Sequence, residues 1–444
     1  MRKLKTALKI VFINLAILVL LIEGVSVATY FKTTGKFFYA QSGSRPIIGF
    51  STLPTEQRRE KEITQQQLHP YFGFADRVGL SHRLSDSQTD HVSNNFGFAS
   101  VHPYPFKRQN PNQFIVGILG GSVATYYSYF ELENNILSAQ LKKLPGLANK
   151  EIIVLPLAMG GFKEPQQLIV LNYFLSLGQD LDLVINIDGF NEIVLSYINY
   201  KDGLDTSMPG DFAFMPLVNL ATGNTSAEEL QLTLQVLKDR KTLKDSITSA
   251  ETSRTATGYL IACLRGRMAQ RRYRQGVFDL NELRISSTRS GESLVQTPIR
   301  AIANEDQALE QIVASWASAS LMMKQLLDQR HIPYFEFVQP NQYHPTGRVF
   351  SKDEATIAIN PASNFRVPVT KGYPLLLAEI GRMQQNGIAV QSAVNVFDRV
   401  SEDVYVDDCC HFNARGNRVF GEYVANAIQQ ALSREDRYTL PGGR

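Results

Sequence analysis

Two side chains far apart in this 444-residue chain, Ser122 and His411, are of the types that perform acyl-ester chemistry. Such chemistry needs an oxygen nucleophile, a base that takes its proton, and a group that orients the base. We take Ser122 as the nucleophile and His411 as the base. Asp408 precedes His411 by three residues and is predicted to orient its ring and fix its tautomer, with Asp407 as a rival for this role. The predicted catalytic residues are therefore Ser122, Asp408 and His411.

The same chemistry needs hydrogen-bond donors for the negative oxygen that forms during acyl transfer. We predict an oxyanion hole made of the backbone N–H groups of Ser122 and Gly161 and the side-chain amide of Asn191. Gly160 is the alternative to Gly161, which is preferred on spacing. Glycine at position 161 would let an acyl group approach the backbone, and an asparagine amide remains a donor at every pH.

The sequence implies neither a metal nor a cofactor. Its cysteines, Cys263, Cys409 and Cys410, are too few and too unevenly spaced for a zinc site. We assign no chemistry to them, because adjacent cysteines seldom bridge each other without strain.

Each candidate oxyanion donor follows a short apolar run that is typical of a buried parallel strand. Strand, turn and helix alternate through the first part of this region, which predicts a right-handed parallel sheet with the polar groups at the carboxyl ends of its strands. The expected strands are 114–119, 151–157, 181–187, 334–340 and 387–397, with helices at 131–143, 165–177, 375–385 and 418–432 among them.

Four blocks occur in the order expected of one known family. They are Gly120-Gly121-Ser122, Ala158-Met159-Gly160-Gly161, Asp188-Gly189-Phe190-Asn191-Glu192 and Asp408-Cys409-Cys410-His411-Phe412. Over residues 112–200 and 330–432 the chain resembles the SGNH/GDSL hydrolase family, although the first block reads Gly-Gly-Ser-Val where that family often has Gly-Asp-Ser-Leu. The resemblance implies a three-layer α/β/α sandwich with a parallel, flavodoxin-like sheet, here with a helical insertion.

The chain is predicted to divide into seven consecutive segments. These are a basic cytoplasmic leader (1–9), a transmembrane signal anchor (10–31), an irregular lead-in (32–111), the first part of the hydrolase domain (112–200), a helical insertion or cap (201–305), the second part of the domain (306–432) and a tail (433–444).

Residues 10–31 are apolar and long enough to cross a bilayer. Basic residues precede them, so the N-terminus is expected in the cytoplasm and the remainder on the exported side of the membrane. A cleaved signal peptide, with Ser26-Val27-Ala28 as its site, is the alternative and would give a secreted protein. The small net charge of +3 gives no indication of a nucleic-acid partner.

The favoured function is a serine-dependent esterase that hydrolyses an O-acyl ester, most simply an O-acetyl ester, on an exported carbohydrate. A polysaccharide O-acetyltransferase would use the same residues, and the sequence does not separate the two. A catalytically silent protein that binds a glycan or assists its export is a third alternative. The sequence gives no indication of the oligomeric state.

Overall fold

The computed structural model describes residues 2–40, 65–84, 87, 89–222, 226–288 and 301–434. The chain forms two compact units. Residues 1–60 and 224–290 make up one, here called the helical unit, and residues 61–223 and 291–444 make up the other, here called the sheet unit.

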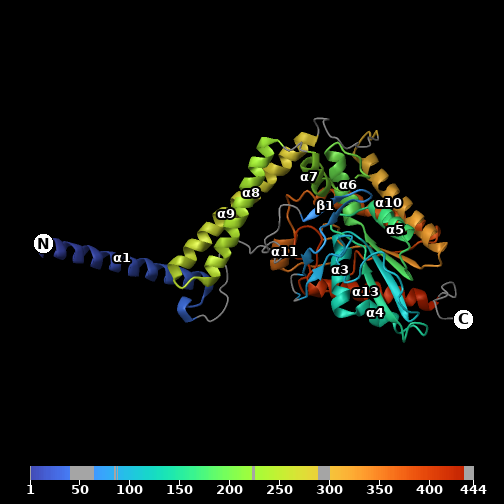
Figure 1. Ribbon diagram of the computed structural model, residues 1–444, viewed down its shortest axis with the longest axis horizontal. Coiled ribbons are helices and arrows are strands. Elements are labelled where there is room, and N and C mark those ends of the chain that lie inside the picture. The colour runs from blue at the N-terminus through green and yellow to red at the C-terminus, as the bar shows by residue number, and fades with distance from the viewer. Residues whose placement is uncertain are drawn as a thin grey trace. The chain divides into compact units, whose positions relative to one another are not determined.

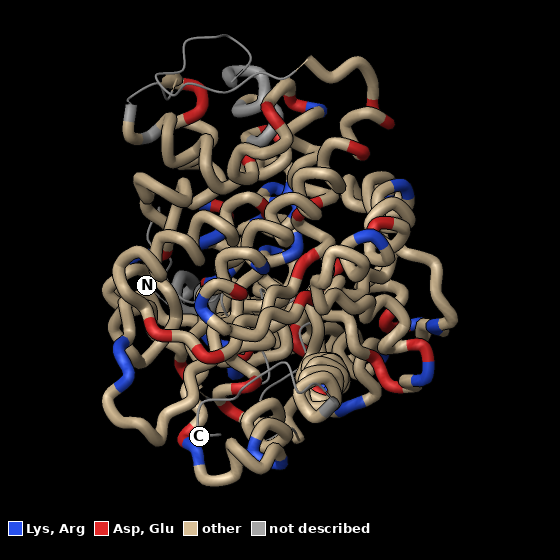
Figure 2. The backbone as a smooth tube through the Cα atoms, turned by 90° about the vertical axis from the view of Figure 1, so that its right-hand side faces the viewer, with Lys and Arg blue, Asp and Glu red and all other residues tan. Residues whose placement is uncertain are grey.

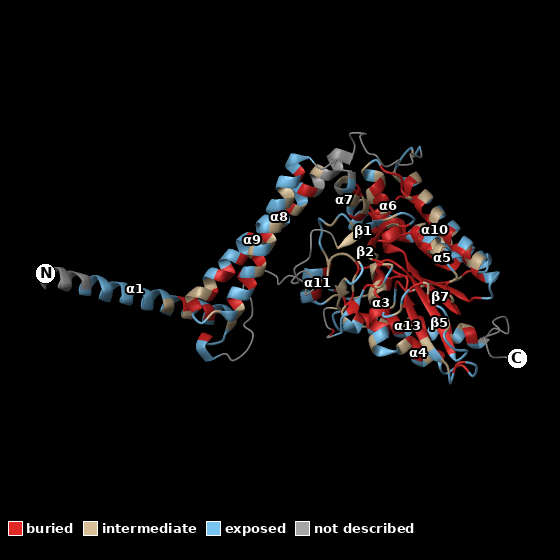
Figure 3. Ribbon diagram, in the orientation of Figure 1, coloured by how far each residue is buried: buried red, intermediate tan, exposed pale blue. Residues whose placement is uncertain are grey.

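The sheet unit is built on five parallel strands. They are β5 (Gln113–Gly120), β6 (Glu151–Pro156), β7 (Leu183–Asp188), β8 (Tyr334–Val338) and β9 (Ala389–Ser392), in the spatial order β6-β5-β7-β8-β9. This is the 2-1-3-4-5 order of flavodoxin-like sheets. All five expected strands are confirmed, although the last is much shorter than 387–397. Every residue of β5, β7 and β8 is buried, because helices cover both faces of the sheet (Figure 3).

The helices beside the sheet form two groups by their mutual contacts, as Figure 1 shows. The first group comprises α3 (Ser122–Asn134), α4 (Ile136–Leu141) and α13 (Ala414–Arg434). The second comprises α5 (Gln166–Ser176), α6 (Phe190–Lys201), α10 (Glu305–Asp328) and α12 (Arg366–Gln385). A parallel sheet flanked by helices in this way is the coarse architecture expected from the sequence.

Two helix boundaries differ from the expected ones in ways that matter for the site. The helix expected at 131–143 is wrong in its start, since α3 begins at Ser122 and ends at Asn134. Asn135, with φ 56°, separates it from α4. The apolar residues from 132 onward keep helical spacing across Asn135, so the sequence pattern does not indicate this break. The closing helix likewise begins at Ala414, only a few residues after His411.

The lead-in is not wholly irregular. Strand β1 (Gln66–His69) pairs with β2 (Gly73–Asp76), and β3 (Ser81–His82) pairs with β4 (His91–Val92), both antiparallel. A short 3-10 helix, η1, spans Phe38–Ala40. Residues 41–64 of the lead-in, and 435–444 of the expected tail, lie outside the described residues.

The helical unit joins segments that are distant in sequence. It contains α1 (Arg2–Thr34), α8 (Ala227–Thr252) and α9 (Ala256–Thr288), whereas α7 (Asp211–Thr222) belongs to the sheet unit. The expected 201–305 insertion is therefore divided between the two units. Within α1, residues Lys9–Thr34 are long and apolar enough to cross a membrane, and their side chains are largely exposed (Figure 3). This helix could anchor the protein in a membrane.

Acidic side chains gather in the interior of the sheet unit beside β7 and β8. Glu164, Asp188, Glu192 and Glu336 are each no more than 4% exposed. Burial raises the pKa of Glu336 to about 7, and burial together with the neighbouring carboxylates raises the pKa of Glu164 and Asp188 well above their ordinary values. Figure 2 shows that acidic and basic residues are interspersed over the backbone of the described residues.

The substitution Glu336→Gln should make the stability of the protein less dependent on pH. The raised pKa means that the folded state binds more protons than the unfolded state above the ordinary value of 4.5. The wild-type free energy of unfolding should therefore fall as the pH rises from 4.5 through about 7, by up to about 3 kcal/mol from this group. Glutamine cannot ionise and still accepts the hydrogen bond from Ser320, so the variant should lose less stability.

Thermal unfolding between pH 5 and pH 8, followed by the fluorescence of the buried Trp316, measures this difference. Glu310→Gln is the matched control, because Glu310 is exposed on α10, and it should keep the wild-type slope. A Glu336→Gln slope equal to that of wild type would contradict the expectation.

Candidate functional site

Ser122 is the first residue of α3, directly after the buried strand β5. The turn between them depends on glycine. Gly120 has φ 133°, and a Cβ there would lie 2.4 Å from the carbonyl oxygen of Ile187. The N–H groups at the start of a helix have no partner within that helix, and the helix dipole is positive at this end. The early start of α3 therefore gives Ser122 a backbone donor beside its own hydroxyl.

His411 reaches Ser122 from the segment that precedes α13. Its Nε2 lies 2.7 Å from Ser122 Oγ, and its Nδ1 lies 2.5 Å from Asp407 Oδ2. Ser122, His411 and Asp407 thus form one continuous chain of hydrogen bonds. Such a chain can move the serine proton onto the imidazole and stabilise the imidazolium that results.

The predicted partner of His411, Asp408, is wrong, and its rival Asp407 takes that place. Asp408 instead accepts a hydrogen bond from Asn360, at 3.1 Å. The reason lies in the turn itself. Asp407 Oδ1 accepts the backbone N–H groups of Cys409, Cys410 and His411 at 3.0, 3.1 and 3.2 Å, so the chain curls around this carboxylate and leaves its second oxygen facing the imidazole.

The local electrostatics support a carboxylate at 407 and a basic ring at 411. Burial alone would raise the pKa of Asp407, but the hydrogen bonds from the His411 ring and from the backbone hold it below its ordinary value. Burial alone would lower the pKa of His411, whereas the Cys410 sulfur and the Asp407 carboxylate raise it well above its ordinary value. These groups favour the protonated ring, so His411 can accept the proton of Ser122 only at a pH above this raised pKa.

Asn191 lies beside the nucleophile, as expected. It stands in the first turn of α6 and is 8% exposed. A Cβ on Gly121 would lie 2.0 Å from Asn191 Nδ2, so the amide occupies the space that any side chain at 121 would fill. The amide nitrogen donates to the carbonyl oxygen of Phe162 at 2.8 Å, which fixes its orientation. An amide nitrogen carries two protons, so this bond uses only half of its donor capacity.

The Gly160–Gly161 turn also lies at the site. A Cβ on Gly160 would lie 3.9 Å from the Cβ of Ser122. Gly161 has φ +88°, a conformation that side chains rarely adopt, and a Cβ there would lie 3.0 Å from the ring of Phe212. The structure therefore brings the backbone of this turn, the amide of Asn191 and the hydroxyl of Ser122 to one edge of the sheet.

Tyr126 was not expected at the site. It lies one turn along α3 from Ser122, and its ring centroid is 4.9 Å from that of His411. The i, i+4 spacing from the serine is a signal that could have pointed to it, but only once the helix is known to begin at Ser122.

Two thiols lie next to the base and could in principle hold a metal. The sulfurs of Cys409 and Cys410 are 3.1 Å apart, and together with a ring nitrogen of His411 they lie within 4.8 Å of one another. Both ring nitrogens of His411 are, however, engaged by Ser122 and Asp407. A metal bound by all three residues would break the hydrogen-bond chain, so these groups do not fit a resident metal centre.

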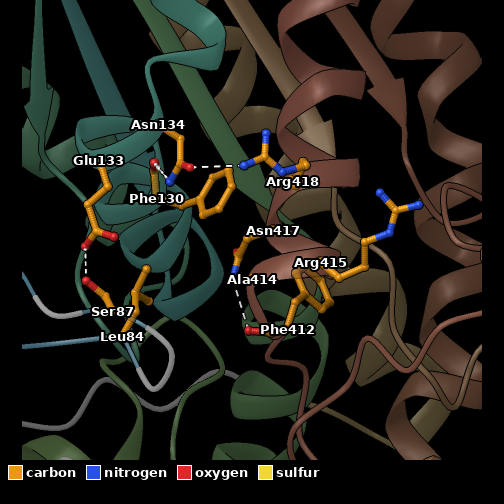
Figure 4. A pocket seen from close by; sticks show the side chains of 10 residues that line it. All are labelled: Leu84, Ser87, Phe130, Glu133, Asn134, Phe412, Ala414, Arg415, Asn417 and Arg418. Carbon is orange, nitrogen blue, oxygen red and sulfur yellow. Dashed lines mark hydrogen bonds between the residues drawn. The ribbon is translucent and has the colours of Figure 1, made fainter.

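A cavity of about 260 Å³ adjoins the segment that carries His411 (Figure 4). It is lined by Leu84, Ser87, Phe130, Glu133, Asn134, Phe412, Ala414, Arg415, Asn417 and Arg418. Two pairs of its polar side chains are hydrogen-bonded. Arg418 donates to Asn134 at 3.1 Å and lies over the Phe130 ring, and Glu133 accepts from Ser87 at 2.7 Å. The two contacts of Arg418 tie the start of α13 to α3, and the Ser87 contact ties the lead-in to α3.

A scan of the chain against models of protein families and a search among curated proteins both find no match. The function is therefore argued from the site itself.

Replacing Asp407 and Asp408 separately should distinguish their roles. Asp407→Asn should slow the reaction of Ser122 with a fluorophosphonate probe by about 10³- to 10⁴-fold, because the imidazole loses its orienting carboxylate. Asp408→Asn should change it by no more than about threefold, since Asp408 contacts Asn360 rather than His411. Probe labelling rates between pH 5 and pH 9, with the modified residue identified by mass spectrometry, make the comparison.

The pH profile adds a readout that loss of folding would not produce. Removing the negative charge at 407 lowers the pKa of His411, so the residual labelling of Asp407→Asn should reach its midpoint at a lower pH than in wild type. A large loss in Asp408→Asn together with an intact Asp407→Asn would reverse the assignment.

Proposed function

We propose that this protein is a serine esterase of the SGNH/GDSL hydrolase type, which removes an O-acyl group from a carbohydrate. The observation that carries the proposal is the hydrogen-bond chain from Ser122 through His411 to Asp407, at 2.7 and 2.5 Å. The order of the blocks around Ser122, Gly161, Asn191 and His411 along the chain adds support.

In the proposed reaction Ser122 Oγ attacks the carbonyl carbon of the ester, and His411 Nε2 accepts the hydroxyl proton. Asp407 keeps the other ring nitrogen protonated and stabilises the positive ring. The tetrahedral intermediate collapses when the C–O bond to the alcohol breaks and His411 returns the proton to the leaving oxygen. Water, activated by the same histidine, then releases the acid from Ser122.

Negative charge would develop on the former carbonyl oxygen in both steps. The N–H groups of Ser122 and Gly161 and the second amide proton of Asn191 are the proposed donors. Contacts with Gly121 and Phe162 hold the Asn191 amide in place. A donor that is already in position would accelerate acyl transfer, because it need not reorganise when negative charge forms on the oxygen.

The proposed substrate is an O-acetylated carbohydrate on the exported side of the membrane, with α1 as the anchor. Basic residues before the apolar segment support this orientation. An O-acetyltransferase would form the same acyl-enzyme on Ser122 and pass the group to a sugar hydroxyl in place of water.

The proposal is tested by turnover of p-nitrophenyl acetate and by acetate release from an acetylated polysaccharide. Wild type should react in both assays, and Ser122→Ala should be at least about 10³-fold slower while its thermal unfolding stays unchanged. A folded wild type that neither reacts with the probe nor releases acetate would favour the catalytically silent alternative.

Competition by a sugar acceptor separates hydrolysis from transfer. For an esterase, adding an unacetylated oligosaccharide should leave acetate release unchanged, because water is the acceptor. For a transferase the acetate yield should fall as acetylated oligosaccharide appears, which mass spectrometry of the products would reveal. Transfer to the oligosaccharide would mean that the reaction is acetyl transfer and not hydrolysis, with the same residues in the site.

A further inference from the structure

Glu23 lies inside the apolar part of α1 yet is held by a partner in the same unit. Its Oε1 accepts the backbone N–H of Ala256 at 2.5 Å, and its Oε2 accepts that of Thr257 at 3.0 Å. The hydroxyl of Tyr39 also donates to Glu23. An acidic residue within a membrane-spanning helix is costly unless it is paired in this way.

The backbone N–H groups at the start of α9 all have hydrogen-bond acceptors within the protein. Its first four N–H groups are all bonded: those of Ala256 and Thr257 to Glu23, that of Gly258 to Thr255 Oγ1 at 3.1 Å, and that of Tyr259 to the Thr255 carbonyl at 3.0 Å. Backbone groups in a lipid environment must find their partners within the protein. This helix end meets that requirement without water.

Packing around Glu23 extends the junction. The hydroxyl of Thr257 donates to Ser26 at 3.0 Å, and the fully buried ring of Tyr30 lies edge-on to that of Tyr259 with centroids 5.1 Å apart. The last turns of α1 and the first turns of α9 therefore form one packed element rather than two loosely joined helices.

The opposite side of α9 is apolar and exposed. Ile261, Leu264 and Met268 are 61%, 55% and 47% exposed and recur at helical spacing, away from the buried seam that includes Tyr259 and Cys263. Exposed arginines flank this stripe on α9 at positions 265 and 271. An apolar stripe bordered by arginines is typical of a helix that lies at the boundary between acyl chains and phosphate groups.

We propose that the first turns of α9 lie in the membrane leaflet from which α1 emerges, at the boundary between acyl chains and phosphate groups. Ile261, Leu264 and Met268 contact acyl chains, the flanking arginines contact lipid phosphates, and Glu23 ties the start of α9 to α1. The occupant of the stripe is lipid because α1 carries this face to the bilayer.

The position of Glu23 along α1 agrees with this depth. Glu23 follows Lys9 by 14 residues, or roughly 21 Å of helix, within a hydrocarbon core of about 30 Å. If the core begins near Lys9, the start of α9 lies in the far leaflet. Cleavage at Ser26–Ala28 would separate Glu23 from α9, so the proposal also requires that α1 remains attached.

Tryptophan quenching by brominated lipids tests the proposal in the full chain. The protein has a single tryptophan, Trp316, which is fully buried in the sheet unit and gives a constant background. Leu264→Trp is compared with Leu234→Trp, whose parent side chain is 65% exposed on α8. Leu234 lies roughly 28 Å of helix from the turn before α9.

In vesicles of phosphatidylcholine and phosphatidylglycerol brominated on their acyl chains, Leu264→Trp should lose about half of its added emission. Leu234→Trp should match wild type. Equal quenching at the two positions would overturn the proposal. So would a blue-shifted but unquenched Leu264→Trp, because protein rather than lipid would then cover the stripe.

The role of Glu23 is tested by combining Leu264→Trp with Glu23→Leu or Glu23→Gln. Leucine removes both acceptors and should reduce the quenching, whereas glutamine keeps one acceptor oxygen and should retain most of it. Quenching that survives Glu23→Leu undiminished would show that Glu23 does not hold the start of α9 in the membrane. These measurements do not depend on esterase activity, so their failure is distinguishable from failure of the proposed function.

Discussion

The close approach of α6 to the end of β5 is the constraint on which the site depends. Gly121 has no room for a Cβ, because the amide of Asn191 lies where that atom would be. Gly120 is similarly confined by the Ile187 carbonyl of the neighbouring strand. Two glycines at one strand end thus let β5, β7 and α6 converge on a single point, and Ser122 stands at that point. A larger residue at either glycine position would push Ser122 away from Asn191.

Buried acidic side chains next to Asn191 accept hydrogen bonds that fix the turn in which it lies. Glu192 accepts the N–H of Gly189 at 2.6 Å and the side chain of Gln167 at 3.2 Å, while Asp188 accepts from the Trp316 indole at 3.2 Å. Burying such groups costs stability when they ionise, and their raised pKa values reflect that cost. These acids lie within three residues of Asn191 in the chain, so the contacts that position Asn191 include groups with raised pKa values.

Both units contain a carboxylate that accepts hydrogen bonds from several backbone N–H groups. In the sheet unit, Asp407 gathers the backbone N–H groups of its own turn. In the helical unit, Glu23 gathers those at the start of a helix more than two hundred residues away. In both places a carboxylate takes the place of water as the acceptor for backbone donors. Glu23 in addition fixes the position of α9 relative to α1. The start of α9 is thereby attached to the apolar helix α1.

The sequence by itself determined the five strands, their parallel arrangement and the positions of Ser122, Asn191 and His411, because short apolar runs ending in glycine or polar residues specify strand ends locally. The three-residue spacing favoured Asp408 over Asp407, and this was wrong, because the curl of three N–H groups around Asp407 turns that carboxylate toward the ring. The start of α3 at Ser122, the place of Tyr126 beside His411 and the pairing of Glu23 with α9 were also decided by tertiary structure. Each depends on a contact between segments distant in the chain, and no local spacing encodes such contacts.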